Sequence, residues 1–188
     1  MRTFIAVDMS ESIKSQVQEY ILSLKNLHPN PKQVKWIRSS GIHITLKFLG
    51  EISDNEAEAM IKGLESIVEQ QNVFSLSVKG TGRFPPQGRF PRVLWAGIED
   101  GGKLVRLQAR IEDMASEIGF QKEKRDFHPH LTLGRIKNPS NLDAVLSRLQ
   151  EDQSKNFGEM KVEKVTFFRS ILKPTGAEYS ILNESTLK

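Results

Sequence analysis

The sequence repeats one short pattern, which reads Gly41-Ile42-His43-Ile44-Thr45-Leu46-Lys47-Phe48 in one place and His128-Pro129-His130-Leu131-Thr132-Leu133-Gly134-Arg135 in another. Each copy has His-x-Thr-Leu at its centre, surrounded by apolar residues typical of strands. Because side chains alternate between the two faces of a strand, each histidine shares one face with its threonine, and the apolar residues take the other. We therefore predict two strands, each holding an imidazole and a hydroxyl, that together form one cleft.

The elements before the two copies follow the same order. Strand and helix patterns occur at 3–8 and 11–27 before the first copy, and at 93–98 and 104–118 before the second. The distance from the first strand to the histidine is nearly equal in both halves, which indicates an internal duplication. We place the repeats at about 1–82 and 91–188, within a single domain covering residues 1–188.

The remaining patterns are less regular. Three more strands are predicted, at 34–37, 42–49 and 74–78, and a helix is predicted after the capping box Ser53–Glu56. The sequence further predicts a loop over 80–91, a short helix from Pro139, and a hairpin in which 160–172 pairs with 177–182. This order is not a strict β-α-β alternation, and the sequence has no Gly-rich phosphate loop. We predict an α+β fold with two antiparallel or mixed sheets.

The composition is typical of a soluble globular protein, with 38% hydrophobic and 27% charged residues. No apolar run approaches the roughly 20 residues of a membrane span, and the opening apolar run is too short for a secretory signal. The absence of cysteine excludes disulfides and thiol catalysis, so we predict a cytoplasmic protein. Lys and Arg outnumber Asp and Glu by 27 to 23, which favours a polyanionic partner, although solubility explains it equally well.

Two matched histidines indicate proton transfer. Imidazole titrates near pH 6.5, so one ring is neutral and the other protonated near neutral pH, as a general base and a general acid at one phosphorus require. Threonine hydroxyls and a cation hold the phosphate oxygens in this scheme. Convergent carboxylates and cysteines are missing from the pattern, so we expect neither a metal nor a cofactor. Outside the pair, His28 is expected on a surface loop, and His128 in the pocket wall or behind His130.

The sequence resembles the two-histidine phosphoesterase superfamily, and within it the 2′-5′ RNA ligase group, also called RNA 2′,3′-cyclic phosphodiesterases. The resemblance spans nearly the whole chain and rests on the segments 2–7, 43–50, 91–97 and 130–135. It implies a bilobal fold with pseudo-two-fold symmetry, whose halves face a central groove. It also implies hydrolysis of RNA 2′,3′-cyclic phosphate ends, including those of tRNA fragments, to 2′-phosphates by a monomer. His43 is then the proton donor and His130 the proton acceptor, and 2′-5′ ligation is the related reaction in which an RNA hydroxyl replaces water.

Several accessory residues are candidates for binding. Strand alternation puts Lys47 beside Thr45 as a phosphate contact or a solvated strand end, and sends Arg135 to the face opposite His130 unless a bulge near Gly134 returns it. The family pattern favours a function for Arg135. In the predicted loop over 80–91 and just after it, cationic residues alternate with aromatic ones. This combination binds single-stranded RNA in some proteins, and in others it only packs the loop. These loop residues are Arg83, Phe84, Arg89, Phe90 and Arg92. Trp36 and Trp95 are expected in the core.

Two other functions remain open. The same histidine pair suits a phosphodiesterase for another cyclic nucleotide or a 2′-5′ oligonucleotide. A groove that binds an RNA end without turnover is the alternative outside the enzymes, although two complete motifs favour catalysis.

Overall fold

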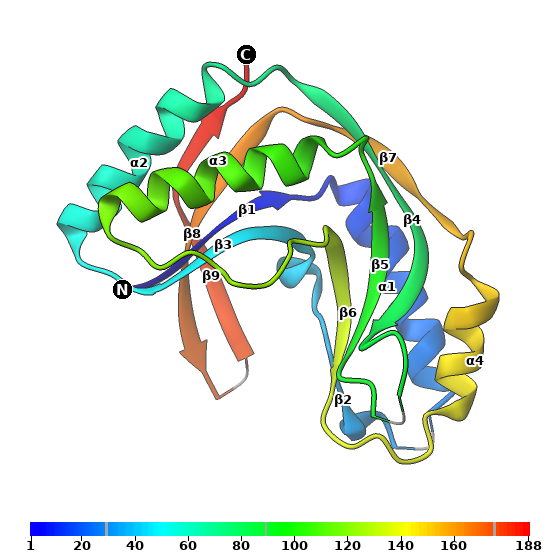
Figure 1. Ribbon diagram of the computed structural model, residues 1–188. Helices are drawn as coiled ribbons and strands as arrows, with labels where there is room; N and C mark the ends of the chain where they lie inside the picture. Colours follow the sequence, from blue (N-terminus) through cyan, green and yellow to red (C-terminus); the bar gives the residue numbers. More distant parts are fainter. Residues whose placement is uncertain (29, 89, 175) are drawn as a thin grey trace.

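The computed structural model describes residues 1–28, 30–88, 90–174 and 176–188 (Figure 1). The elements are β1 Arg2–Asp8, α1 Glu11–Asn26, β2 Val34–Trp36, β3 His43–Glu51, α2 Asp54–Val68, β4 Phe74–Phe84, β5 Val93–Glu99, α3 Lys103–Ile118, β6 His130–Ile136, α4 Asp143–Glu151, β7 Asn156–Val162, β8 Lys164–Lys173 and β9 Gly176–Thr186. Short 3-10 turns at Pro31–Gln33 and Ser39–Gly41 flank β2. The predicted α+β class is confirmed.

The strands form two sheets, ordered β3-β1-β8-β9 and β2-β6-β5-β4-β7, with antiparallel pairing throughout the described chain. In each sheet a His-x-Thr strand pairs with the strand that opens its half of the chain, β3 with β1 and β6 with β5. The next strand comes from the other half of the sequence: β8 lies beside β1, and β4 beside β5. The sheets therefore cut across the expected repeats of 1–82 and 91–188, and the duplication itself stays a prediction.

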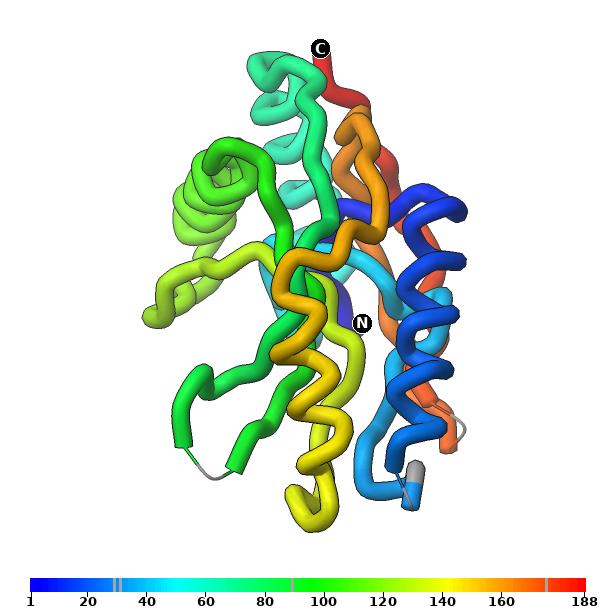
Figure 2. Tube along the Cα trace, turned by 90° about the vertical axis from the view of Figure 1, so that its right-hand side faces the viewer, coloured from blue at the N-terminus to red at the C-terminus, as the bar shows by residue number. Residues whose placement is uncertain are grey.

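The helices form where capping and apolar spacing agree. Ser10 caps α1 by accepting from the backbone N–H of Ile13, and Ser53 and Glu56 form the expected capping box of α2. Helices α2 and α3 pack on the first sheet, whereas α1 and α4 pack on the second, as the side view of Figure 2 shows for α1 and α4. Buried residues from both sheets join one apolar cluster, as expected of a single domain. No helix in the described ranges is long and apolar enough to span a membrane.

Two predicted boundaries are wrong. Strand β4 continues through the expected loop to Phe84, because Gly80, at φ +77°, adjoins a register irregularity, and Gly82 leaves room for the Trp95 ring. The expected strand over 160–172 is two strands, since β7 ends at Val162 in the second sheet and β8 begins at Lys164 in the first.

Each His-x-Thr strand contains a bulge directly after its threonine. In β3, Thr45 lies opposite Ala6 and Lys47 opposite Ile5, so Leu46 is the extra residue. In β6, Thr132 lies opposite Trp95 and Gly134 opposite Leu94, which makes Leu133 the extra residue. An extra residue reverses the alternation of side chains beyond it. Phe48 and Arg135, rather than Lys47 and Gly134, therefore return to the histidine face.

Candidate active site

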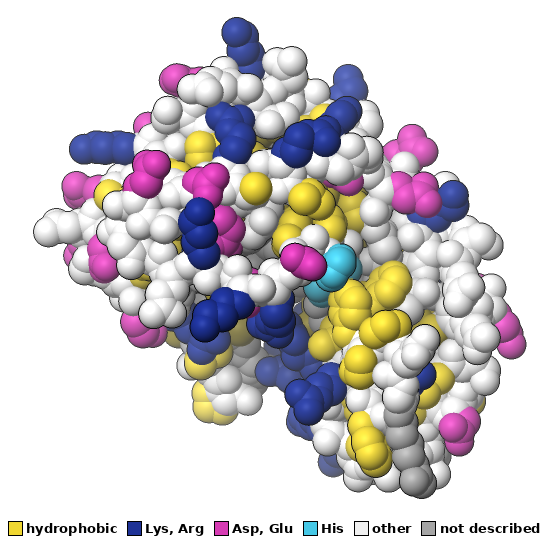
Figure 3. Space-filling view, in the orientation of Figure 1, with side chains coloured by type: hydrophobic (Ala, Val, Ile, Leu, Met, Phe, Trp, Pro, Cys, Tyr) yellow, Lys and Arg dark blue, Asp and Glu magenta, His cyan; other side chains and the backbone are white. Residues whose placement is uncertain are grey.

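A groove between the two sheets contains both His-x-Thr pairs. Its larger hollow, of about 1340 Å³, is lined by His43, Thr45, His130 and Thr132 together, and the space-filling view shows histidine beside apolar side chains and an acidic one, with cationic side chains further along (Figure 3). All four side chains are partly buried. Strands β3 and β6 also contact each other directly. The structure thus brings together the two histidines and two threonines that the sequence singles out.

His43 lies in an aromatic cage. The centroid of its ring is 4.9 Å from that of Phe4, 5.9 Å from Phe168 and 5.5 Å from Tyr179, whose ring is presented edge-on. Burial lowers the pKa of His43 to about 4, with Asp8 opposing and Lys14 reinforcing the shift. The imidazole of the free protein is therefore neutral at pH 7.

His130 has a defined tautomer. Its Nδ1 lies 2.7 Å from the carbonyl oxygen of His128, and because a carbonyl only accepts, Nδ1 carries the proton and donates it. In the neutral ring, Nε2 then holds the lone pair and is the nitrogen that can accept a proton. Burial lowers the pKa of His130, as do the charges of Arg135 and His128, whereas the bond to the His128 carbonyl raises it.

Arg135 reaches the groove because of the bulge at Leu133. It lies on the same face as His130 and Thr132, and it lines both hollows of the groove. The planar guanidinium at this position suits bidentate hydrogen bonding to two anionic oxygens of a phosphate. The bulge near Gly134 on which the prediction for Arg135 depended is therefore present.

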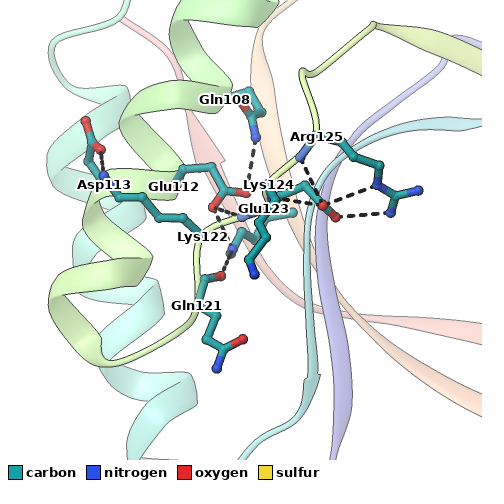
Figure 4. Close-up of polar contacts among 9 residues, drawn as sticks. Gln108, Glu112, Asp113, Gln121, Lys122, Glu123, Lys124 and Arg125 are labelled. Atoms are coloured by element: carbon teal, nitrogen blue, oxygen red, sulfur yellow. Dashed lines mark hydrogen bonds and ion pairs between the residues drawn. The ribbon is translucent and has the colours of Figure 1, made fainter.

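Lys47 does not lie on the predicted face of β3. The bulge at Leu46 turns it away from the face of His43 and Thr45, and only 5% of the residue is exposed, although it lines the larger hollow. Its role as a phosphate contact stays a prediction. Lys47 Nζ lies 2.7 Å from Glu112 Oε2 and donates to the carbonyl of Gln121, also at 2.7 Å. Glu112 also accepts from Gln108 and from the backbone N–H of Glu123, and Figure 4 shows how these three residues lie. The expected alternation fails because one extra residue lies between Thr45 and Lys47.

The predicted RNA-binding loop divides into two groups. Phe84 and Arg92 line the larger hollow, and the Phe84 ring meets that of His130 edge-on at 5.2 Å. Arg83 lies outside both hollows, where it donates to the carbonyl of Gly88, because its register places it on the opposite face from Phe84. Phe90 is 62% exposed and lines neither hollow. The fifth candidate, Arg89, falls outside the described residues.

Other expectations are also corrected or sharpened. His28 is buried rather than on the surface, and its Nδ1 accepts from the backbone N–H of Asn30. His128 is exposed, lines the larger hollow and orients His130 through its carbonyl. Trp36 packs against the core as expected, whereas Trp95 lies on the groove face, with its ring 5.4 Å from that of Phe84.

Sequence reasoning missed the aromatic cage of His43. Phe4, Phe168 and Tyr179 come from β1, β8 and β9, which only the sheet order brings beside β3. The sole sequence signal was Phe4, which lies in the opening segment that carries the family resemblance. Among the described residues, no group of three or more histidine, aspartate or glutamate side chains is arranged to hold a metal ion.

A family model for the 2′-5′ RNA ligase superfamily matches residues 13–172. The chain belongs to this superfamily. Among its relatives, the RNA 2′,3′-cyclic phosphodiesterase of Archaeoglobus fulgidus is 36% identical over 97% of this chain and 98% of its own length. The protein of the same name from Thermotoga maritima is 34% identical, over 98% and 94%.

Solved structures show the same fold. The crystal structure of the Thermus thermophilus protein TT0787 has a TM-score of 0.82 and 28% identity, with 100% of this chain and 98% of that chain covered. Escherichia coli LigT, crystallised with 3′-AMP, has a TM-score of 0.78 at 23% identity, over 99% and 97% of the two chains. This second likeness supports the fold alone.

Proposed function

We propose that this protein hydrolyses the 2′,3′-cyclic phosphate ends of RNA to 2′-phosphate ends, without a metal ion, by paired histidine catalysis. The observation that carries the proposal is the presence of His43 and His130, each on a matched strand, in a single groove. Relatives that align over nearly their whole length are named RNA 2′,3′-cyclic phosphodiesterases, which supports the substrate class.

The chemistry follows from the two imidazoles. His130 Nε2 removes a proton from water as the water oxygen attacks the phosphorus, and the bond from phosphorus to the 3′-oxygen breaks. Protonated His43 gives its proton to that departing oxygen, which leaves a 3′-hydroxyl and a 2′-phosphate. Thr45, Thr132 and Arg135 hold the non-bridging oxygens, whose negative charge grows in the transition state.

The low pKa of His43 makes substrate binding part of this cycle. An imidazole that is neutral when the groove is empty does not act as an acid at pH 7. A phosphodiester anion beside the ring stabilises the imidazolium and raises its pKa, since an opposite charge favours the charged form. The substrate thus promotes protonation of the group that later protonates its leaving oxygen.

The same groove supports ligation when the 5′-hydroxyl of a second RNA replaces water. The product is then a single RNA strand joined by a 2′-5′ linkage, and no free 2′-phosphate forms. Ends of this kind on tRNA fragments are suitable substrates, and we expect a monomer to act on them in the cytoplasm. Hydrolysis is the primary reaction because water is the more abundant nucleophile.

Phosphorus NMR of an oligonucleotide with a 2′,3′-cyclic end, incubated in EDTA, tests the proposal. We expect a 2′-phosphate as the product. His43→Ala and His130→Ala should each lower kcat by about 10²- to 10⁴-fold, the range for general acid–base catalysis. Circular dichroism checks that both variants remain folded. Full activity of either variant, a 3′-phosphate product or loss of activity in EDTA would contradict the mechanism, and a panel of cyclic nucleotides and 2′-5′ oligonucleotides separates other substrates.

A further inference from the structure

The groove continues from the histidines into two differently charged regions. The smaller hollow, of about 620 Å³, is lined by Arg2, Lys35 and Arg38, which line only this hollow, and by Phe48, which lines both; we call these four residues the cationic arm. The larger hollow extends along residues 121–128, the loop between α3 and β6, which we call the loop arm. Both hollows are lined by His43, Thr45, Phe48, Thr132 and Arg135, so an RNA strand that ends at the histidines can leave through either one.

The cations of the two arms differ in their partners. Within the described chain, Arg2, Lys35 and Arg38 form no ion pair, and the single carboxylate lining the cationic arm, Glu51, lies 3.3 Å from the N-terminal ammonium. In the loop arm, by contrast, carboxylates already neutralise two of the three Lys and Arg residues, and Lys124 is the third. Lys122 pairs with Asp113, and Arg125 pairs with Glu123.

Like charges lie directly opposite each other at the entrance of the cationic arm. Lys35 of β2 is the cross-strand partner of Arg135 of β6, so both side chains extend from the same face of the sheet. Two cations in this position destabilise a strand pair unless an anion lies between or beside them. A chain of phosphates supplies that anion, and Arg135 already faces the phosphate site.

An exposed aromatic ring completes the arm. Phe48 is 63% exposed, although its ring centroid lies 5.8 Å from that of Phe4 on the floor of the groove. The bulge at Leu46 is what brings it to the histidine face. An exposed ring beside unpaired cations is the combination that binds single-stranded RNA, because bases stack on the ring while the cations hold the backbone.

We infer that the RNA strand leading to the cyclic phosphate lies in the cationic arm, with its upstream phosphates on Lys35 and Arg38 and a terminal base against Phe48. The inference rests on the proposed function and assigns a binding surface to it. It places the RNA away from Arg83 and Phe90, two of the RNA-binding candidates that the sequence pattern offered.

Substrate length tests this assignment. For a hexanucleotide with a 2′,3′-cyclic end, Lys35→Ala and Arg38→Ala should each raise KM about tenfold, the loss of one charge-assisted contact. The double variant should also flatten the dependence of log(kcat/KM) on log[salt] by about 0.7 per cation removed. A nucleoside 2′,3′-cyclic phosphate has no upstream phosphate, so its KM should change much less.

Lys124→Ala with Arg125→Ala removes two charges from the loop arm and serves as the matched comparison. We expect it to leave the KM of the hexanucleotide within about twofold. A larger increase in KM from this variant than from Lys35→Ala with Arg38→Ala would overturn the inference. Equal KM values for all variants and the wild type would overturn it as well.

Binding without turnover separates this inference from the proposed function. Fluorescence anisotropy measures the Kd of a labelled hexanucleotide that already ends in a 2′-phosphate. If the protein hydrolyses nothing but the cationic-arm variants weaken this binding, the proposed function fails and the RNA path stands. If hydrolysis is normal and neither KM nor Kd changes in these variants, the path fails and the proposed function stands.

Discussion

The two His-x-Thr strands carry the same pattern and the same bulge, yet they hold their histidines in different environments. His43 of β3 lies among Phe4, Phe168 and Tyr179, and burial lowers its pKa to about 4. His130 of β6 donates to a backbone carbonyl. The repeated pattern therefore sets the geometry of the pair, whereas the chemical difference between its members comes from neighbouring strands.

The positions after the two bulges differ even more. On the side away from the histidines, the first strand has Lys47 and the second has Gly134; on the histidine face, the first has Phe48 and the second Arg135. One strand thus offers a ring and a buried cation, and the other offers an exposed cation. Replacing these residues tests whether each contributes to a different property: folding stability, catalysis or RNA binding.

The largest expected effect is at Lys47. Lys47→Met leaves the Glu112 carboxylate, whose side chain is only 11% exposed, without its cation, and breaking a buried pair in this way costs about 3–5 kcal/mol. Urea unfolding at pH 7 measures the change. Adding Glu112→Gln removes the uncompensated charge, so the double variant should recover part of the loss. A cost below about 1 kcal/mol for Lys47→Met would show that the pair contributes little to the fold.

The next effect separates Arg135 from Phe48. Arg135→Ala should lower kcat by about 10²- to 10³-fold, because it removes a donor to oxygens that gain charge in the transition state. Phe48→Ala should raise KM by about tenfold with little change in kcat, since stacking holds the base equally in the ground and transition states. Steady-state kinetics on the hexanucleotide measures both. A fall in kcat for Phe48→Ala, or a pure KM effect for Arg135→Ala, would contradict this division.

The sequence predicted most elements and both His-x-Thr pairs because these depend on local periodicity. It failed for Lys47 because a bulge is set by the partner strand, and the alternation of residues 43–48 carries no sign of the extra residue. It missed Tyr179 because pairing between β8 and β1 brings that ring to His43 from the far end of the chain. The repeat boundaries likewise give no sign that β4, from the first half of the sequence, pairs with β5, or that β8, from the second half, pairs with β1.

The last expected effect concerns pH and stability. Folded His43 stays neutral down to about pH 4, whereas the unfolded chain protonates it near its ordinary pKa of 6.5. Between these values the unfolded state binds more protons, so this group's contribution is complete above pH 6.5 and is lost as the pH falls to 4. At 1.36 kcal/mol per pKa unit, the loss is roughly 3 kcal/mol.

His43→Gln isolates that contribution, because glutamine does not titrate. Urea unfolding of both proteins between pH 7 and pH 4 gives the free energy of unfolding at each pH. Asp8 and Lys14, the two charges that act on His43, are unchanged in the variant. The wild type should lose roughly 3 kcal/mol more than the variant over this range. If the free energies of unfolding of the two proteins fall in parallel with pH, the aromatic cage does not disfavour the protonated ring of His43. The pKa values of the two histidines would then be closer than their different surroundings indicate.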